Sequence, residues 1–367
     1  MRERSTILIA CILAAGALLS SCGGQVAYEA TESGGDQATG KARVALPRQL
    51  PDPDTKAPDT AKPAKVYIMM GQSNMVGFGM IEPETTKGTL AHLVRKDGKY
   101  PHLVDDAGKW TVRNDVWCVQ VTAGSRKDWL QPGFGARAKF IGPELGFGHV
   151  MGFVHDEVVL IIKATMGNRA LGWDLMPPSS RTIMPKDHPN QWYQGWQYDI
   201  FVKDTHRVLD NLPRYFPGYK DQGYEIAGFA WWQGHKDQNT PGHVKKPPYN
   251  DNWAKSYEKN LVILIRDLRR EFKAPDAPFA LATIAFGGDK LGGGGLTVAN
   301  AQLAVSGERG KYEEFAGNVR TVEARGFWRD AKESPTGAGY HYNHNAGTYM
   351  DVGDALGRAM ADMVGDE

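Results

Sequence analysis

Residues 64–75 of the 367-residue chain read AKVYIMMGQSNM, an apolar run that stops at a glycine and continues into a short polar turn. The run Val66–Met70 is short and apolar, which predicts a buried strand. A serine on a tight strand-to-helix turn can present its hydroxyl above the edge of a sheet, where backbone amides lie close to a developing oxyanion. Ser73 is therefore a candidate nucleophile, although a serine cap on a glycine turn fits the same residues.

Downstream of this turn, strand-like and helix-like patterns alternate along the chain. Further buried-strand patterns occur at 157–164, 224–232, 279–286 and 319–324, and helical patterns at 144–154, 196–216, 253–272, 296–308 and 348–364. Strands that alternate with helices imply right-handed crossovers and a mostly parallel sheet with helices on both faces. We therefore expect five strands, with ligands bound at their carboxyl ends.

Composition excludes two classes of protein. With 43 Lys+Arg against 42 Asp+Glu, the formal net charge is +1, whereas an electrostatic nucleic-acid binder shows a basic excess or stripe. Three cysteines in a chain of this length cannot hold together a small disulfide scaffold. We expect no nucleic-acid partner, and the sequence says nothing about oligomeric state.

The amino-terminal segment 1–22 has the pattern of an export signal. Two arginines precede the apolar run Ile7–Leu19, which is shorter than the roughly 20 residues that a spanning helix needs. The run ends in Leu-Ser-Ser-Cys, which resembles a bacterial lipobox, and Cys22 would then carry the lipid. An ordinary signal peptide with a chance cysteine is the alternative. We expect an exported lipoprotein, anchored at the outer membrane, in the periplasm or at the cell surface.

Residues 23–63 are rich in Gly, Ala, Thr, Asp, Pro and Lys and contain few aromatic or β-branched residues. Such a segment cannot bury enough apolar area to offset its ordering entropy, so we expect a flexible tether. The globular domain is then expected over residues 64–367.

Three further segments place polar or glycine residues where a site should form. Gly167 follows the second predicted strand, and a glycine there lets a backbone amide approach a ligand closely, although a plain turn fits equally well. Gln233 follows the third strand and could donate its amide to an oxyanion, or could simply be a satisfied loop residue. His341 and His344 precede the last helix and could supply a general base. No third ligand accompanies them at a convincing spacing, so no metal is expected.

These segments together resemble one enzyme family. The motif GQSNM, the later Trp232-Gln233-Gly234, the Gly142-Pro143-Glu144 helix start and the HYNHNAGTY segment within Asp330–Met360 are similar to the SGNH hydrolases. The resemblance is to the sialic-acid-acetylesterase-like branch that includes carbohydrate esterase family six, and it covers about 64–364. It implies a three-layer α/β/α sandwich with a flavodoxin-like, five-stranded, mostly parallel sheet.

The resemblance also implies a mechanism that uses neither a metal nor an organic cofactor. Ser73 would attack an ester carbonyl, with His341 as general base and His344 as the alternative. The oxyanion would be held by the Ser73 and Gly167 amides and by the Gln233 side chain. The substrate would be an O-acetylated carbohydrate, either a polysaccharide or a sialic-acid-like sugar.

The triad acid departs from the family pattern. Relatives place an aspartate three residues before the histidine, but Ala338 stands three before His341. The acid could be Asp330 or Glu333, or the pair could work as a dyad. This departure motivates an alternative function, a non-catalytic glycan-binding lipoprotein on an esterase scaffold. We expect further substrate contacts from the polar residues Gln72, Asn74, Asn168, Arg169 and Asp237.

Overall fold

A computed structural model describes residues 45–53, 56–183, 192–245 and 251–365 of the protein. The described residues form a seven-stranded sheet in the order β4-β3-β6-β1-β7-β8-β9. Neighbouring strands are parallel except β3 and β4, and a separate antiparallel pair joins β2 to β5. The strands are β1 (Ala64–Gly71), β2 (Gly79–Met80), β3 (Arg113–Thr122), β4 (Lys127–Leu130), β5 (Phe140–Ile141), β6 (Val159–Thr165), β7 (Tyr224–Trp232), β8 (Phe279–Ala282) and β9 (Val319–Val322).

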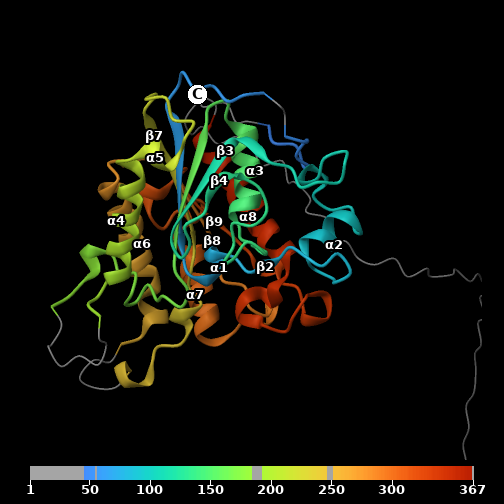
Figure 1. Ribbon diagram of the computed structural model, residues 1–367. Coiled ribbons are helices and arrows are strands. Elements are labelled where there is room, and N and C mark those ends of the chain that lie inside the picture. The colour runs from blue at the N-terminus through green and yellow to red at the C-terminus, as the bar shows by residue number, and fades with distance from the viewer. Residues whose placement is uncertain (1–44, 54–55, 184–191, 246–250, 366–367) are drawn as a thin grey trace, which may run out of the picture. The chain divides into compact units, whose positions relative to one another are not determined.

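Helices cover both faces of this sheet. Figure 1 shows α4 and α6 on one side and α3 and α8 on the other, which gives the three layers expected from the sequence. The α-helices are α1 (Ser73–Val76), α2 (Leu90–Arg95), α3 (Glu144–Val154), α4 (Trp196–Leu209), α5 (Leu212–Tyr215), α6 (Trp253–Glu271), α7 (Gly293–Ala304) and α8 (Ala346–Val364).

Strand β1 explains why its sequence is apolar without alternation. Val66, Ile68 and Met70 pack into one core cluster with residues of α4 and α6, whereas Tyr67 and Met69 pack into the other with residues of α3 and α8. Both faces of a central parallel strand are buried, so both sets of side chains must be apolar. All five are at most 2% exposed.

The predicted fold class is confirmed, and the number of strands in the sheet was predicted too low. The five predicted strands are β1, β6, β7, β8 and β9, and their spatial order, 2-1-3-4-5 in chain order, is the flavodoxin-like one. Strands β3 and β4 extend the sheet beyond β6. Arg113, Asn114, Asp115 and Gln120 interrupt the apolar pattern of β3, which is why the sequence did not mark it as a buried strand.

The helix predicted over 196–216 is two helices, α4 and α5. Asn211 has φ −138° and ψ 40°, outside the helical region, and Pro213 lies in the first turn of α5. Proline has no N–H to donate to the preceding turn, so it begins a helix more readily than it continues one.

Part of the predicted tether packs against the domain. Leu50 is 4% exposed and belongs to the core cluster of α3 and α8, and Arg358 on α8 donates to the carbonyls of Pro47 and Arg48, both at 3.0 Å. The domain therefore begins before residue 64, because an apolar side chain within the polar segment reaches the core. The predicted signal with Cys22, and residues 23–44, lie outside the described residues. Within the described ranges, no helix has the length and apolar character needed to cross a membrane.

Candidate active site

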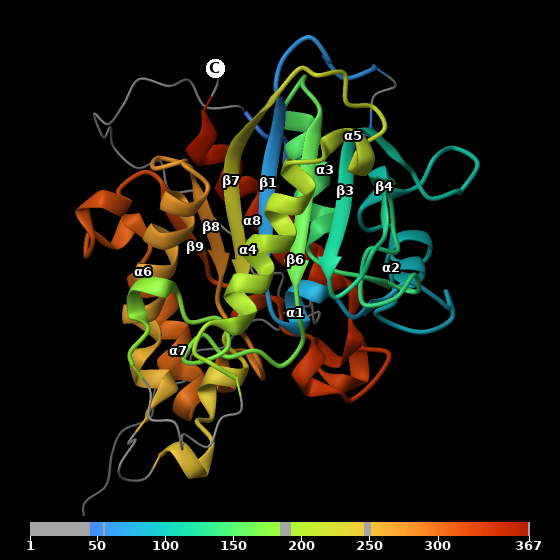
Figure 2. The ribbon, with the colours of Figure 1, turned by 60° about the vertical axis from the view of Figure 1, so that its left-hand side comes forward.

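Ser73 lies directly beyond the carboxyl end of β1, as the first residue of α1, at the end of the sheet where Figure 2 shows α1. The turn is tight because position 71 is a glycine. A Cβ added to Gly71 would lie 2.4 Å from the carbonyl oxygen of Trp232 at the end of β7, too close for any larger residue. The Ser73 side chain is 7% exposed. The strand-to-helix turn predicted from the sequence is therefore present.

Gly167 lies beside Ser73, as the sequence predicted. In the parallel register, Gly71 pairs with Thr165, so the chain leaving β6 passes next to the serine turn. A Cβ added to Gly167 would lie 3.8 Å from the Cβ of Ser73. In the described part of the chain, neither the Ser73 amide nor the Gly167 amide donates to another backbone group. Both donors are therefore available to a ligand atom at this point.

A buried ion pair holds the other end of α1. Lys163 on β6 donates from Nζ to the carbonyl of Val76 at 2.7 Å, to that of Phe134 at 2.6 Å and to Glu144 Oε2 at 2.6 Å. Glu144 also accepts from the Gly142 amide at 2.8 Å. Both charged side chains are fully buried, and their hydrogen bonds compensate for the lost hydration. This role of Lys163 was not predicted from the sequence, because a lone lysine inside a strand pattern resembles an edge residue.

The histidine segment 339–344, far from the serine turn in sequence, lies close to it in the fold. The His341 ring stacks on Phe78, with centroids 3.8 Å apart and planes 6° apart, and His344 lies 5.9 Å from His341. The Tyr349 hydroxyl is 3.3 Å from both Asn74 Oδ1 and the carbonyl oxygen of His341. One phenol thus links the residue after the nucleophile to the candidate base.

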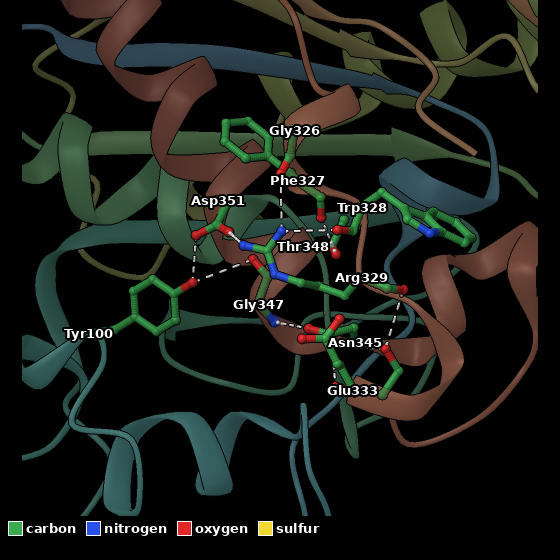
Figure 3. A network of polar contacts seen from close by, with 11 residues as sticks. Tyr100, Gly326, Phe327, Trp328, Arg329, Glu333, Asn345, Gly347, Thr348 and Asp351 are labelled. Carbon is green, nitrogen blue, oxygen red and sulfur yellow. Dashed lines mark hydrogen bonds and ion pairs between the residues drawn. The ribbon is translucent and has the colours of Figure 1, made fainter. Parts of the chain in front are cut away.

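A polar network fixes the chain on both sides of this segment to the start of α8 (Figure 3). Asn345 caps α8 by accepting from the Gly347 amide at 2.9 Å, and its Nδ2 donates to the carbonyl of Glu333 at 2.9 Å. Asp351 accepts from the Tyr100 hydroxyl at 2.6 Å and pairs with Arg329 at 3.1 Å. These contacts tie residues 329–347 to the helix, so the histidines are carried on a well-supported loop.

His341 is held in its neutral form. Burial, together with the nearby His344 and His235, lowers the pKa of His341 to about 4. Burial also lowers the pKa of His344. An imidazole that is neutral near pH 7 can accept a proton, as a general base must. In the described part of the chain, no hydrogen bond joins the Ser73 hydroxyl to either histidine, and such bonds are often long without substrate.

The two candidate acids do not contact a histidine. Asp330 is exposed, and its carboxylate accepts from the indole Nε1 of Trp328 at 2.8 Å. Glu333 is also exposed, and it contributes its backbone carbonyl to the network described above. Among the described residues, the geometry is that of a serine with a histidine and no orienting carboxylate.

Gln233 directs its amide into the protein. Its Nε2 lies 2.6 Å from Asp237 Oδ2 and 2.8 Å from the carbonyl oxygen of Arg169, and its Oε1 accepts from the Tyr257 hydroxyl at 2.9 Å. The side chain is 1% exposed. Both amide hydrogens have protein acceptors, so in this structure Gln233 is not a third oxyanion donor. Tyr257, which fixes the amide orientation, was not identified from the sequence because a helix tyrosine usually only packs.

Gln72 and Asp237 hold the loops of the site together. Gln72 is 1% exposed, and its Oε1 accepts from the amides of Gly234 at 3.3 Å and Lys236 at 3.1 Å. Asp237 is fully buried and accepts from the amides of Leu171 at 2.9 Å and Gly172 at 2.7 Å. Burial raises the pKa of Asp237 to about 7, whereas its hydrogen bonds act in the opposite direction. Both side chains are directed into the protein.

Of the remaining predicted substrate contacts, two are accessible. Asn168 is exposed, with the left-handed φ of 57°, and Arg169 beside it is partly exposed. Asn74 is 2% exposed and is used by Tyr349. The described residues contain no group of three or more His, Cys, Asp or Glu side chains arranged to hold a metal ion.

Solved structures that align with the chain include three of low sequence identity. One is a protein from Arabidopsis thaliana, with 19% identity over 81% of this chain and 98% of that chain and a TM-score of 0.49. A carbohydrate acetylesterase from Xanthomonas citri is 16% identical over 82% of this chain and 56% of that chain, with a TM-score of 0.46. NanS is 14% identical over 75% and 84% of the two chains, with a TM-score of 0.40.

The family comparison is decisive. No curated protein sequence matches the chain. The family model described as carbohydrate esterase, sialic acid-specific acetylesterase, matches residues 63–362, which is most of the chain and nearly all of its described part. This confirms the resemblance inferred from the serine, glycine, glutamine and histidine segments. The chain therefore belongs to the carbohydrate esterase family of sialic acid-specific acetylesterases.

Proposed function

We propose that the protein is a serine esterase that removes O-acetyl groups from carbohydrates through a Ser73–His341 dyad. The observation that carries the proposal is the meeting of three elements at the carboxyl edge of the sheet. Ser73 lies there with two backbone amides, its own and that of Gly167, that have no backbone acceptor in the described part of the chain. The Tyr349 hydroxyl links the serine turn to the neutral His341. Membership in the carbohydrate esterase family supports the choice of substrate class.

In the first half-reaction, the Ser73 hydroxyl attacks the acetyl carbonyl while His341 takes its proton. The oxyanion accepts from the Ser73 and Gly167 amides, and each such donor is typically worth about 3 kcal/mol in the transition state. The ester C–O bond then breaks, and His341 returns the proton to the departing sugar hydroxyl. In the second half, water attacks the acetyl-serine by the same route and releases acetate.

A dyad without a carboxylate is consistent with the surroundings of His341. Phe78 fixes one face of its ring, and the Tyr349 hydroxyl contacts its backbone carbonyl. An orienting acid normally sets the tautomer and position of the imidazole. Here the position is set by packing and backbone contacts.

The test is acetate release from 4-nitrophenyl acetate by the wild-type protein and by Ser73→Ala. We expect the variant to lose at least about a thousandfold in kcat/KM, as when a serine hydrolase loses its nucleophile. Covalent labelling by a fluorophosphonate should also require Ser73. Unchanged activity in the variant would refute the assignment.

The missing carboxylate favours one alternative, a glycan-binding protein that has kept the esterase scaffold. Among the described residues, no acid contacts His341, as a degraded catalytic site would show. This alternative predicts retention of acetylated glycans with no labelling of Ser73. The fluorophosphonate experiment therefore separates the two functions.

We also propose that the protein is exported and anchored through a lipid on Cys22. The proposal is supported by the apolar run Ile7–Leu19 and the Leu-Ser-Ser-Cys sequence that follows it. Metabolic labelling of the expressed full chain with a radioactive fatty acid should mark the wild-type protein and not Cys22→Ser. Equal labelling of both chains would contradict a lipid on this residue.

A further inference from the structure

Two tryptophans form a stacked pair beside the loop that carries Gly167. The rings of Trp192 and Trp196 have centroids 5.1 Å apart and planes 27° apart, and Trp196 begins α4. Trp192 is 61% exposed, and its neighbour Tyr193 is 59% exposed. Most large apolar side chains of the domain are buried, so two adjacent exposed aromatic residues form a surface that needs an explanation.

The exposed ring is held in place. The indole Nε1 of Trp173, itself 4% exposed, donates to the carbonyl oxygen of Trp192 at 3.0 Å. The Tyr193 hydroxyl donates to Asp199 Oδ2 at 2.9 Å. With its backbone fixed and one side against Trp196, Trp192 presents a preorganised aromatic surface to solvent. Binding to such a surface costs little conformational entropy.

The pair is joined to the oxyanion loop by direct contacts. Arg169 comes two residues after Gly167, and its guanidinium lies 4.8 Å from the centroid of the Trp196 ring. Asp174 accepts from Trp196 Nε1 at 3.1 Å and from the Ala170 amide at 2.8 Å. The aromatic pair and the Gly167 loop therefore have a fixed spatial relation, at the end of the sheet where substrate would arrive.

Resting on the acetylesterase function proposed above, we propose that the exposed face of Trp192 is a subsite that stacks against a pyranose ring of the acetylated glycan. A pyranose has an apolar C–H face and a rim of hydroxyls. The indole matches that face, and the exposed Asn168 with Arg169 supplies polar partners for the rim. An acyl chain would instead need an enclosed apolar groove, whereas the Trp192 ring is open to solvent.

The test compares Trp192→Ala with the wild-type protein on two kinds of substrate. The first is 4-nitrophenyl acetate, which has no sugar ring. The second is whichever of O-acetylated xylotetraose, O-acetylated cellotetraose and 9-O-acetylated sialyllactose the wild-type protein hydrolyses fastest. We expect Trp192→Ala to lower kcat/KM on the glycan by about tenfold, mainly through KM, because one aromatic stacking contact is removed. On 4-nitrophenyl acetate the change should be under about twofold, because that substrate makes no such contact.

Two further variants control for structural damage. Trp192→Phe keeps an aromatic face and should restore most of the glycan activity. Tyr224→Ala removes a 40% exposed aromatic residue at the start of β7, at the amino ends of the strands and so opposite the site. This variant should leave kcat/KM unchanged on both substrates.

Each outcome decides something. Equal losses on both substrates, or no loss on either, would overturn the subsite. Activity on 4-nitrophenyl acetate with none on the three glycans would overturn the subsite and leave the esterase function standing. If the wild-type protein hydrolyses nothing, the proposed function fails, and calorimetric binding of unacetylated cellotetraose and sialyllactose to wild type and Trp192→Ala then decides the subsite alone.

Discussion

His341 carries out its proposed role without a charged partner. Its ring is packed on Phe78, and the two titratable groups that act on its pKa, His344 and His235, are histidines rather than carboxylates. Every one of these influences lowers its pKa, whereas an orienting aspartate would raise it. His341 should therefore remain unprotonated, and able to act as a base, at lower pH than the histidine of a complete triad.

This difference predicts an unusual pH–rate profile. Because the pKa of His341 lies at about 4 in the folded protein, kcat/KM on 4-nitrophenyl acetate should stay constant from pH 8 down to about 5 and fall only near pH 4. The measurement is kcat/KM at each pH, with the reaction stopped in aliquots and the released acetate quantified. An acid limb centred between pH 6 and 7 would show that His341 has an ordinary pKa or is not the base.

His344→Ala provides the matched control. His344 lowers the pKa of His341, so its removal should move the acid limb to higher pH while activity at pH 8 stays within a few-fold of the wild type. His341→Ala should lose about a thousandfold at every pH. At His341 itself, the unfolded state binds more protons than the folded state between about pH 4 and 6.5, so this residue's contribution to stability falls as pH falls through that window. Circular dichroism at each pH should confirm that the protein is folded.

At the scale of secondary-structure elements, α1 depends on its surroundings. A helix of four residues has no stability of its own, because nucleation is unfavourable and few intrahelical bonds form. Its position is set by contacts from other elements, namely Lys163 of β6 at Val76, the Gly234 and Lys236 amides at Gln72, and Tyr349 of α8 at Asn74.

Lys163→Met should therefore affect both stability and catalysis. The change leaves the Glu144 carboxylate buried without its partner, which costs roughly 3–5 kcal/mol of unfolding free energy. Urea denaturation measures this loss, and kcat/KM per folded molecule should also fall, because the Val76 end of α1 is released. The double variant Lys163→Met/Glu144→Leu should recover part of the stability.

Lys96→Met is the control for this prediction. Lys96 pairs with Glu84 at 2.9 Å, but its side chain is 58% exposed, so its removal should cost less than about 1 kcal/mol. Similar losses for Lys96→Met and Lys163→Met would contradict the account of the buried pair.

The elements that the sequence predicted best are those with uninterrupted patterns. The predicted bounds of α3 and β7 agree with the structure at both ends, and Ser73 and Gly167 lie side by side because parallel strands end at one edge. Strand β3 was missed because polar residues interrupt its pattern. The direction of the Gln233 amide could not be predicted, since the Arg169 carbonyl and the Tyr257 hydroxyl that help to fix it come from elements distant in sequence.

At the scale of the whole domain, the segment that precedes β1 packs against the sheet and the helices. Leu50 fills a position in the core of the α3 and α8 layer, and the Asp59 amide donates to the Asp156 carbonyl at 2.7 Å, next to β6. This segment adds buried area to a domain whose family match begins at residue 63.

A chain that starts at residue 64 should therefore be less stable than one that starts at residue 45. Loss of the buried Leu50 side chain alone accounts for about 2 kcal/mol. Thermal unfolding of the two chains measures the difference, while kcat/KM should be equal, since no residue of the proposed site is removed. In the longer chain, Leu50→Ala should reproduce most of the loss, and equal melting temperatures for the two chain lengths would contradict the prediction.

The backbone between His341 and Asn345 limits how this site can vary by mutation. Tyr342, Asn343 and His344 have successive φ values of 49°, 56° and 58°, a left-handed run that side chains branched at Cβ avoid. A library randomised at position 344, where the side chain is only partly buried, should return asparagine, aspartate and glycine far more often than valine or isoleucine. The histidine loop would then diversify by exchange among a few permitted residue types, whereas the exposed aromatic surface beside α4 has no such backbone restriction, so new sugar preferences would arise there first.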